Sequence, residues 1–361
     1  MKILHHERKR LESHFSIERL FAEIRRHMPP DCDVTSCPAL EPSAGILPRW
    51  LNVRHAARQK ADVHHIVGDS HYLAFGLPPE KTVLTIHDCG ALNRLKGLPR
   101  ALLKYFWFTG PMRRAAVVTT ISESSKNELR KWVGSLADKV VVVPDCVFEE
   151  FAYDPKPFNE QRPVVLQVGT KWNKNVERVV EAVAGTGCRL EVVGELQKAG
   201  DGVSSHGLEK INTDSFRAGD TGAKSGAPRN AGESIVRELG RLTDKELVGA
   251  YRRCDMLVFA SLYEGFGLPI LEAQAMGRPV ITSNFGAMRE AAGDGAFLVD
   301  PYSIEEIRAA ILRVKNELAL REELVRKGRE NAERFRAEAV ALKYAEIYRA
   351  VKVQGTKGLR D

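Results

Sequence analysis

A short apolar run, a glycine-rich turn and a helix follow one another between Met256 and Gly277. The run Met256–Phe259 is typical of a buried strand. Pro269 stands where a helix would begin, and Gly277 stands where that helix would end. The turn from Glu264 to Leu268 (E-G-F-G-L) lets the backbone approach a ligand, and the N–H groups of a helix N-terminus favour an anion such as phosphate. A strand, a turn and a helix in this order indicate an α/β domain with a ligand at the turn.

Two glutamates flank this turn. Glu264 stands in the turn itself, and Glu272 lies near the end of the first helical turn. Carboxylates beside an anion site would not bind the anion itself, but they can accept hydrogen bonds from neighbouring hydroxyl groups, as in a sugar or a ribose. The alternative is a plain strand–turn–helix with two solvated glutamates.

The longer string from Ser261 to Ile281, S-L-Y-E-G-F-G-L-P-I-L-E-A-Q-A-M-G-R-P-V-I, favours a ligand site. It resembles the signature of retaining, nucleotide-sugar-dependent glycosyltransferases of family 4, which have the GT-B fold. Their hallmark is two glutamates separated by seven residues, matched here by Glu264 and Glu272. The similarity continues through Thr282-Ser283-Asn284 and Glu290 to the segment G-D-G-A-F-L-V-D-P. It covers about residues 63–350, most densely in the second half of the chain.

The chain is long enough for two domains, because 361 residues exceed one ordinary core. We expect an α/β protein of GT-B type, with two Rossmann-like domains facing a cleft. The predicted boundaries are 1–150 for the N-terminal acceptor domain and 151–336 for the nucleotide-sugar domain, with Phe148–Pro163 as the linker. In the family that the chain resembles, a helix such as residues 337–361 returns to the N-terminal domain.

Apolar runs alternate with helical patterns along the chain, which predicts mainly parallel sheets. The expected strands are Met1–His5, Val63–Val67, Thr82–His87, Ala116–Ile121, Lys139–Val143, Val164–Val168, Leu190–Val193 and Met256–Phe259. The expected helices include Ser16–Met28, Ser124–Trp132 with Ser122 as its cap, one from Asn175, two that begin with capping boxes at Thr243–Glu246 and Ser303–Glu306, and Ala337–Val353. Residues 197–233 contain few apolar side chains, so we expect a flexible surface insertion, or alternatively a loop that faces the acceptor.

The composition excludes several classes of protein. No run of about 18 apolar residues could span a membrane, and the N-terminus lacks the apolar region of a signal peptide, so we expect a cytoplasmic protein. The six cysteines show no metal-ligand spacing, which favours reduced thiols. Asp31-Cys32-Asp33 has the form D-x-D but follows two prolines, and we interpret it as a chance match in a loop.

The net charge of +7 arises from basic residues interleaved with acidic ones. Without a long basic block or a known module, nucleic-acid binding is not expected. An anionic donor, an anionic acceptor or an anionic membrane surface would each explain the excess charge.

The resemblance implies a role for each matched residue of the second domain. Glu272 would accept hydrogen bonds from the ribose hydroxyls, and Glu264 would face the transferred sugar. Backbone N–H groups would contact the sugar and the diphosphate from Gly265, Phe266, Gly267 and Leu268.

The segment V-G-T-K-W-N-K-N-V matches the phosphate-binding segment of the family and includes Gly169, Thr170, Lys171 and Lys174. Lys174 would lie opposite the diphosphate, where a fixed cation stabilises the leaving group. The alternative is a solvated lysine at the start of a helix. The family commonly has an arginine before this lysine or a basic residue after the glycine. Here Asn173 and Thr170 stand at those positions, so Lys171 would have to supply the second charge.

In the first domain, T-V-L-T-I-H-D-C resembles a family strand that ends in His-Asp. His87 would then lie near the anomeric region of the sugar as a positioning group. The alternative is a structural histidine at a strand end. Ser122 and Glu123 match another family segment at the cleft, although capping explains them as well. The usual glycine-rich loop after the first strand is absent, which leaves the acceptor undefined.

The stretch Leu98–Arg114 mixes bulky aromatic residues with basic ones. Such a stretch could dock on an anionic membrane that carries a lipid-linked acceptor. The alternative is an ordinary helix beside the cleft with its aromatic side chains in the core.

Taken with the resemblance, these patterns predict a retaining, metal-independent hexosyltransferase of polysaccharide biosynthesis. Its co-substrate would be a nucleotide diphosphate sugar, its acceptor a glycan, a lipid-linked sugar or a small molecule, and it would need no further cofactor. Helix N-termini and Lys174 would stabilise the diphosphate in place of a metal. Two alternatives stay open: a nucleotide-sugar epimerase on the same fold, and an inactive donor-binding subunit.

Overall fold

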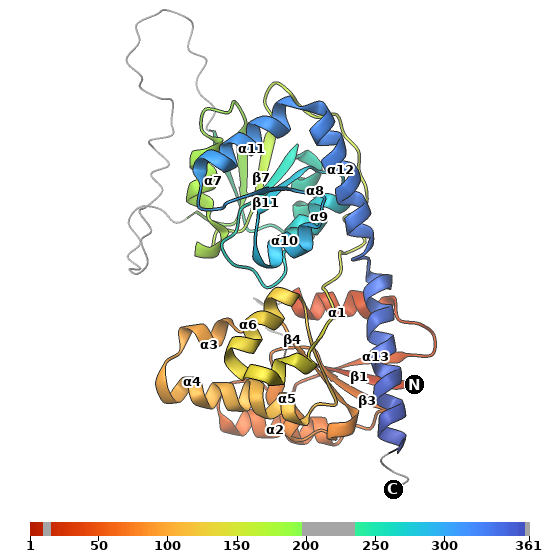
Figure 1. The fold of residues 1–361 in the computed structure, drawn as a ribbon. Coiled ribbons are helices and arrows are strands. Elements are labelled where there is room, and N and C mark those ends of the chain that lie inside the picture. Colours follow the sequence, from red (N-terminus) through yellow and green to blue (C-terminus); the bar gives the residue numbers. More distant parts are fainter. Residues whose placement is uncertain (10–15, 197–234, 358–361) are drawn as a thin grey trace, which may run out of the picture. The chain divides into compact units, whose positions relative to one another are not determined.

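The computed structural model describes residues 1–9, 16–196 and 235–357. The insertion predicted at 197–233 therefore lies outside the described residues. The chain divides into two compact units, Met1–Glu149 with Arg334–Asp361, and Glu150–Glu333. Each unit has a six-stranded sheet with helices on its faces (Figure 1). This confirms the predicted α/β fold.

The sheet of the first unit has the strand order β2-β1-β3-β4-β5-β6, with every neighbouring pair parallel. Its strands are β1 (Lys2–Glu7), β2 (Asp33–Pro38), β3 (Val63–Ile66), β4 (Thr82–Ile86), β5 (Val117–Thr120) and β6 (Val141–Val142). The α-helices are α1 (Ser16–Arg26), α2 (Ile46–Ala57), α3 (Gly90–Arg94), α4 (Gly97–Leu103), α5 (Gly110–Arg114) and α6 (Glu123–Val133). Shorter helical segments are η1 (His71–Phe75), η2 (Pro79–Lys81), the π-helix η3 (Lys104–Thr109) and η4 (Gly134–Lys139).

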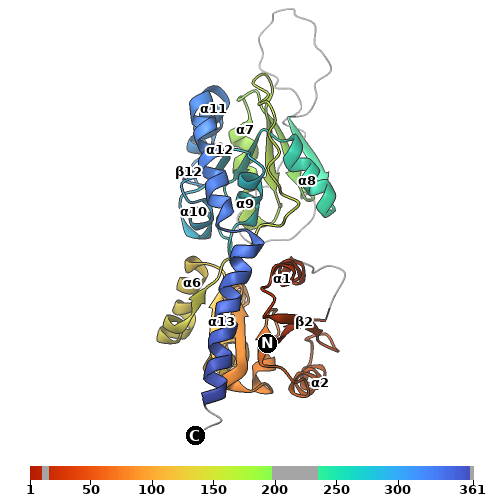
Figure 2. The same ribbon diagram turned by 90° about the vertical axis from the view of Figure 1, so that its right-hand side faces the viewer.

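The last helix, α13 (Ala337–Lys357), belongs to this first unit. Both views show it running beside the first sheet (Figures 1 and 2). Tyr344 and Tyr348 on α13 are fully buried, and their rings contact His65 of β3. Burial of two aromatic side chains contributes several kcal/mol, on the order of 2 each, which is enough to hold the helix to the sheet.

The sheet of the second unit has the order β12-β11-β10-β7-β8-β9, again parallel throughout. Its strands are β7 (Val164–Val168), β8 (Arg189–Val193), β9 (Val236–Gly240), β10 (Met256–Phe259), β11 (Val280–Ser283) and β12 (Phe297–Val299). Its helices are η5 (Trp172–Lys174), α7 (Val176–Val183), α8 (Asp244–Arg253), α9 (Leu268–Ala275), α10 (Gly286–Ala292), α11 (Ile304–Asn316) and α12 (Leu318–Glu333).

The strand order of the second sheet reverses between β7 and β10. One β-α series continues outward from β7 through β8 to β9, and the other continues from β10 through β11 to β12. The loops after β7 and β10 therefore diverge to opposite sides. In open α/β sheets such a switch point, at the carboxyl ends of the strands, is where ligands bind.

Several strands buried on both faces were predicted with the right bounds or nearly so, because they are continuous apolar runs. The strands β7 and β10 match the prediction residue for residue. The elements that were not predicted include the strands β2, β9, β11 and β12 and the helices α2 and α10. Most residues of β2 are exposed or half-buried, and α2 leaves Ile46, Leu47 and Trp50 exposed, so neither shows the pattern of a buried face.

Two local predictions need correction. Asp33 does not lie in a loop but begins β2, while Asp31 pairs with Arg349 at 2.7 Å. The capping box at Ser303 is half formed: its hydroxyl accepts from the Glu306 N–H (3.1 Å), but the Glu306 carboxylate accepts from the Asp300 N–H (2.9 Å).

The capping box at Thr243 is complete, and all six cysteines are free thiols, as predicted. Within the described ranges, no helix has both the length and the apolar character needed to cross a membrane.

Candidate functional site

The loop after β7 folds around the side chain of Lys174. Gly169 has φ +90°, and a Cβ atom at this position would lie 2.9 Å from Cε of Lys174. Only glycine therefore suits both the backbone conformation and the space. Asn175 ends the loop in the left-handed region (φ 57°), and its buried amide donates to the carbonyls of Ala260 (3.0 Å) and Pro301 (2.7 Å). One asparagine thus fixes the loop to the chain beyond β10 and β12.

Lys174 forms an ion pair with Glu264 across the switch point. Its Nζ lies 2.7 Å from Oε1 of Glu264 and 4.5 Å from the ring centroid of Phe259, the last residue of β10. The two charged side chains are 17% and 15% exposed. The structure therefore brings together two of the three predicted catalytic residues, in a position that is partly shielded and still open to a ligand.

Asn173, which stands where the family commonly has arginine, holds Glu264 in place. Its amide donates to the carbonyl of Tyr263 (2.7 Å) and to Oε1 of Glu264 (3.2 Å), and its own carbonyl accepts from the Leu262 N–H (2.8 Å). The loop after β7 and the turn after β10 are thereby joined. Asparagine at this position orients Glu264 through hydrogen bonds, whereas an arginine would add a positive charge.

The other two predicted residues of the first loop differ in their surroundings. Thr170 packs against the end of β8, since a Cβ at Gly194 would lie 2.9 Å from its Oγ1. Lys171 is exposed at the start of η5.

The turn after β10 leads directly into α9. Gly267, with φ +123°, stands just before the helix, and a Cβ there would come within 3.2 Å of Ile270. Phe266 is buried, so the turn packs onto the unit. The first backbone N–H groups of a helix lack acceptors within the helix, so the N-terminus of α9, beginning at Leu268, is suited to an anion. This end of α9 follows the same turn that holds Glu264.

Glu272 on α9 is held by a residue that sequence reasoning missed. Its Oε2 accepts a hydrogen bond of 2.7 Å from the hydroxyl of Tyr251 on α8. Burial, and then the charge of Glu272, raise the pKa of Tyr251 well above its ordinary value, so this hydroxyl stays a donor. Glu272 is only 6% exposed. A buried tyrosine needs a partner for its hydroxyl, and that requirement is the one signal that could have drawn attention to Tyr251.

Two further buried polar groups lie at the ends of these strands. The Gln167 side chain in β7 donates to the carbonyl of Lys174 (3.0 Å), while its Oε1 has no hydrogen-bond partner among the described residues. The same holds for Oγ of Ser261, which follows β10. Buried polar atoms are usually paired, so these two atoms are exceptions close to the switch point.

His87 belongs to the first unit, which is described separately. It follows β4, and its Nε2 donates to the carbonyl of Val67 at the end of β3 (3.0 Å). Asp145 is a charged neighbour: burial raises the pKa of this carboxyl to about 6, and His87 partly offsets that effect. Ser122 caps α6, because its hydroxyl accepts from the Ser125 N–H at 2.9 Å.

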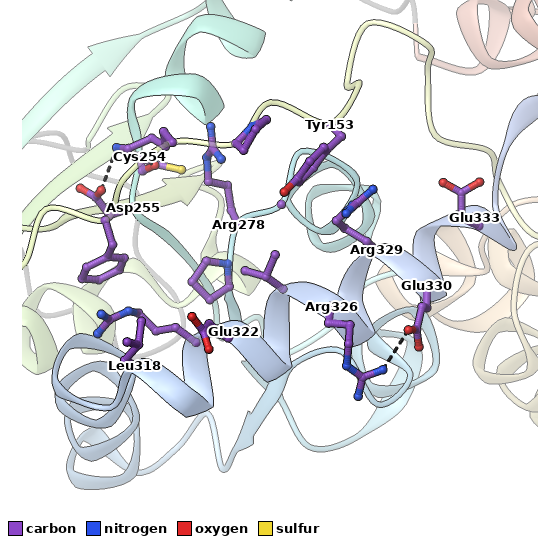
Figure 3. Close-up of a pocket in the computed structure, with 17 residues that line it drawn as sticks. Tyr153, Cys254, Asp255, Arg278, Leu318, Glu322, Arg326, Arg329, Glu330 and Glu333 are labelled. Atoms are coloured by element: carbon purple, nitrogen blue, oxygen red, sulfur yellow. Dashed lines mark hydrogen bonds and ion pairs between the residues drawn. The ribbon is translucent and has the colours of Figure 1, made fainter.

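A pocket of about 580 Å³ lies in the second unit near the amino ends of β10 and β11 (Figure 3). It is therefore at the opposite edge of the sheet from the Lys174–Glu264 pair. Its charged side chains largely satisfy one another, as in Lys156 with Asp255 (2.7 Å) and Arg326 with Glu330 (2.8 Å). None of the predicted catalytic or donor-binding residues lines this pocket.

Comparison with known proteins identifies the same two halves of the chain. The sequence model of the glycosyl transferases group 1 matches residues 233–331, and that of glycosyltransferase family 4 matches residues 16–150. The first match contains the turn after β10 and Glu272. The second covers most of the first unit, including His87.

Relatives and solved structures agree with these matches. O-antigen chain mannosyltransferase B of Escherichia coli is 25% identical over 304 residues, which is 80% of this chain and 75% of that protein. Serotype-specific mannosyltransferase WbdA of Escherichia coli is 26% identical over 68% of this chain but only 30% of its own length. The structure of Anabaena Alr3699/HepE in complex with UDP and glucose aligns with TM-score 0.70 and 16% identity, over 97% of this chain and 100% of that one.

The family 4 model matches residues of the first unit and the group 1 model matches residues of the second, and the alignment with the Anabaena structure runs through both units. The chain therefore belongs to the group 1 glycosyltransferases of the GT-B fold.

Proposed function

We propose that this glycosyltransferase moves a sugar from a nucleotide diphosphate sugar to an acceptor with retention of the anomeric configuration. The observation that carries the proposal is the partly shielded Lys174–Glu264 ion pair at the switch point of the second sheet. A cation and a carboxylate at this place suit the two ends of a sugar phosphate, which has an anionic leaving group and neutral hydroxyls.

The ion pair would exchange partners when the donor binds. The diphosphate would lie at the N-terminus of α9 and take Lys174 from Glu264. As the bond between the anomeric carbon and the phosphate oxygen breaks, negative charge grows on the diphosphate, and a fixed cation lowers the barrier. Glu264, still held by Asn173, would then accept hydrogen bonds from the sugar hydroxyls.

Two further residues would position the donor. Glu272 would accept from the ribose hydroxyls in the orientation that Tyr251 imposes on it. His87, from the first unit, would contact the sugar near the anomeric carbon. Its hydrogen bond to the Val67 carbonyl gives the imidazole a defined orientation, which a positioning group requires.

The names of the relatives indicate which sugar donors should be tested first. Two are mannosyltransferases, one of them an O-antigen chain enzyme, and the Anabaena structure contains UDP and glucose. We therefore propose hexosyl transfer in polysaccharide synthesis, with a glycan or lipid-linked acceptor. Mannosyl and glucosyl nucleotides are the first donors to test.

Donor binding is measured by calorimetry with a panel of nucleotide sugars, with and without EDTA. Products are then analysed by NMR with and without acceptor extracts. We expect binding that EDTA does not change, and transfer that keeps the anomeric configuration. Inversion would refute the retaining mechanism, and strict dependence on Mg²⁺ would refute metal independence. Conversion of the donor without acceptor would indicate the epimerase, and binding without turnover would indicate an inactive subunit.

We also propose peripheral contact with a membrane through α4 and η3. Leu98, Leu102, Tyr105 and Phe106 are 71%, 51%, 51% and 45% exposed, whereas Phe108 packs in the core. An exposed apolar face among basic residues favours an anionic bilayer surface.

Sedimentation with anionic vesicles at low salt tests this contact. Leu98→Ser with Leu102→Ser should abolish sedimentation. A second variant, Leu318→Ser, changes a 59% exposed leucine of the second unit and should have no effect. If the unmodified protein does not sediment, the membrane contact is refuted.

A further inference from the structure

A cluster of ligand-type side chains in the first unit contains none of the residues assigned to the donor. Glu23 is on α1, and His27 follows one turn later. Glu149 closes the first stretch of the unit. One nitrogen or oxygen from each of these three side chains lies within 4.8 Å of the others. Glu338, in the first turn of α13, adds an oxygen 3.5 Å from Nε2 of His27.

The hydrogen bonds of His27 require a positive charge inside this cluster. Its Nδ1 lies 3.1 Å from the carbonyl oxygen of Glu23, which can only accept, so Nδ1 carries the hydrogen. Its Nε2 then faces the carboxylates of Glu149 (2.9 Å) and Glu338 (3.5 Å), which also accept when ionised. A neutral imidazole would point its lone pair at two anions. Either a proton or a metal ion must therefore lie between them.

This arrangement is the one that metal-binding histidines commonly have. When one ring nitrogen donates to a backbone carbonyl, the tautomer and the ring orientation are fixed, and the other nitrogen presents its lone pair to the metal. Here the carbonyl of Glu23, one turn earlier on the chain, performs that task. The imidazole therefore does not have to reorient to bind a cation.

Glu23 supplies a second, independent indication of a ligand. Its side chain is only 5% exposed. Oε2 accepts from Arg26 at 2.8 Å, while the buried Oε1 has no hydrogen-bond partner among the described residues. A buried carboxylate oxygen without a partner is costly, and a cation bound by this carboxylate would offset that cost.

We propose that Glu23, His27, Glu149 and Glu338 bind one Zn²⁺ ion. A set of one imidazole nitrogen and several carboxylate oxygens suits Zn²⁺, whereas Ca²⁺ and Mg²⁺ prefer oxygen ligands alone. Tetrahedral bonds of about 2.0–2.1 Å place ligand atoms about 3.3 Å apart. The separations of 2.9 and 3.5 Å from Nε2 to the two carboxylates lie on either side of this value. Glu149 and Glu338 are 67% and 57% exposed, so both can adjust.

The ion would act on structure and not on catalysis. The chain leaves the first unit after Glu149 and re-enters it at Arg334, and the two passing segments are joined where the Val147 N–H donates to the Phe335 carbonyl (2.8 Å). Zn²⁺ would tie both segments to the end of α1. The proposed donor site uses other residues, so Zn²⁺ binding and donor binding are tested separately.

The experiment is a calorimetric titration of the chelator-treated full-length protein with ZnCl₂, with Co²⁺ absorption as a second readout. We expect one Zn²⁺ per chain and a higher unfolding temperature when Zn²⁺ is present, because the ion binds the folded state. Glu149→Gln and Glu338→Gln should each weaken Zn²⁺ binding by about tenfold or more. Both side chains are exposed, so neither change threatens folding.

Asp31→Asn is the matched control, since it also removes one exposed carboxylate of the first unit, at its pair with Arg349. This variant should bind Zn²⁺ as the unmodified protein does. Absence of binding by the unmodified protein would overturn the proposal and leave a proton between His27 and its carboxylates. Equal affinity in all three variants would place the ion elsewhere and also overturn it.

Discussion

The two units organise their polar side chains in opposite ways. In the second unit, the charged pair Lys174–Glu264 lies at the carboxyl edge of the sheet, where each side chain keeps some exposure. In the first unit, polar groups lie beneath α13 and are completely buried. The hydroxyl of Tyr348 lies 2.9 Å from Nε2 of His5 and 2.7 Å from Nδ1 of His65.

The hydrogen bonds among His5, His65 and Tyr348 form without charge on these three side chains. Burial, and then neighbouring basic groups, lower the pKa values of His5 and His65 well below the ordinary range. Burial likewise raises the pKa of Tyr348 well above its ordinary value. Near neutral pH these groups are therefore uncharged donors and acceptors. The network continues from His65 to Thr85 at 2.7 Å.

This difference indicates what each region does. A partly buried charge at a sheet edge costs free energy unless a ligand or a counter-ion pairs with it. Neutral hydrogen bonds in a core, in contrast, fix one packing arrangement. The charged edge should therefore control activity, and the buried network should control stability. The following experiments each change one region, and together they measure activity and stability.

The largest expected effect is loss of stability in acid. In the unfolded chain each histidine takes up a proton near pH 6.5, whereas burial lowers the pKa of His6 to about 3 and that of His64 to about 4. Between these values the unfolded chain binds more protons, so stability falls as the pH falls below about 6.5. Asp145 acts in the opposite sense, because burial raises its pKa to about 6 and the folded state gains its proton first.

At about pH 5, each buried histidine should lower the free energy of unfolding by about 2 kcal/mol. The sum of these losses should exceed the stability gained from protonation of Asp145. The neighbours that lower these pKa values further are themselves basic groups: His65, Arg25 and His6 for His5, His87 and His6 for His65, His64 and His55 for His6, and Lys81 for His64.

Urea unfolding between about pH 7 and pH 5 measures the free energy, and amide hydrogen exchange locates the loss. No histidine occurs among the described residues of the second unit, so the first unit should open first. Equal loss of protection in both units would contradict the proposed division.

The next effect concerns turnover. Lys174→Ala should lower kcat by roughly 10²–10³, since a fixed cation at a leaving group is worth about 3–4 kcal/mol. Stability should change little, because a partly exposed ion pair contributes about 1 kcal/mol or less. Lys171→Ala removes an exposed lysine from the same loop, which the resemblance also assigns to the diphosphate, and should lower kcat less than Lys174→Ala because Lys171 is more exposed. A similar fall in both variants would show that charge in the loop matters but that the pairing with Glu264 does not.

Much of the second unit could be predicted from sequence, for identifiable reasons. The strands β7 and β10 are continuous apolar runs, and the two glutamates have a distinctive spacing. The partners of these residues could not be predicted. Tyr251 and Glu272 lie 21 positions apart on different helices, and Asn173 meets Glu264 across 91 positions. Such contacts depend on how two loops are folded over the sheet, which local patterns do not encode.

The first unit was harder to predict because its informative residues violate the usual patterns. Four histidines in β1 and β3 are buried, although histidine is usually intermediate in burial. Their hydrogen-bond network with α13 was not predicted from the sequence. In α4 and η3, apolar side chains such as Leu98 and Phe106 are exposed instead of buried. Hydropathy alone therefore predicts the wrong burial for these residues, both in the core and on the surface of this unit.

The smallest expected effects come from one chemical change made once in each unit. Tyr251→Phe and Tyr348→Phe each remove the hydroxyl of a fully buried tyrosine. Each loss leaves hydrogen-bonding groups without a partner, so both variants should lose about 1–3 kcal/mol of unfolding free energy. Only Tyr251 contacts a residue assigned to the donor, so only Tyr251→Phe should also weaken nucleotide diphosphate binding, by roughly threefold to tenfold, as Glu272 loses its fixed orientation. Urea unfolding and calorimetry on the two proteins measure both quantities. Weaker nucleotide binding in Tyr348→Phe would mean that the buried network of the first unit also controls the donor site. It would contradict the hypothesis that the charged edge controls activity and the buried network controls stability.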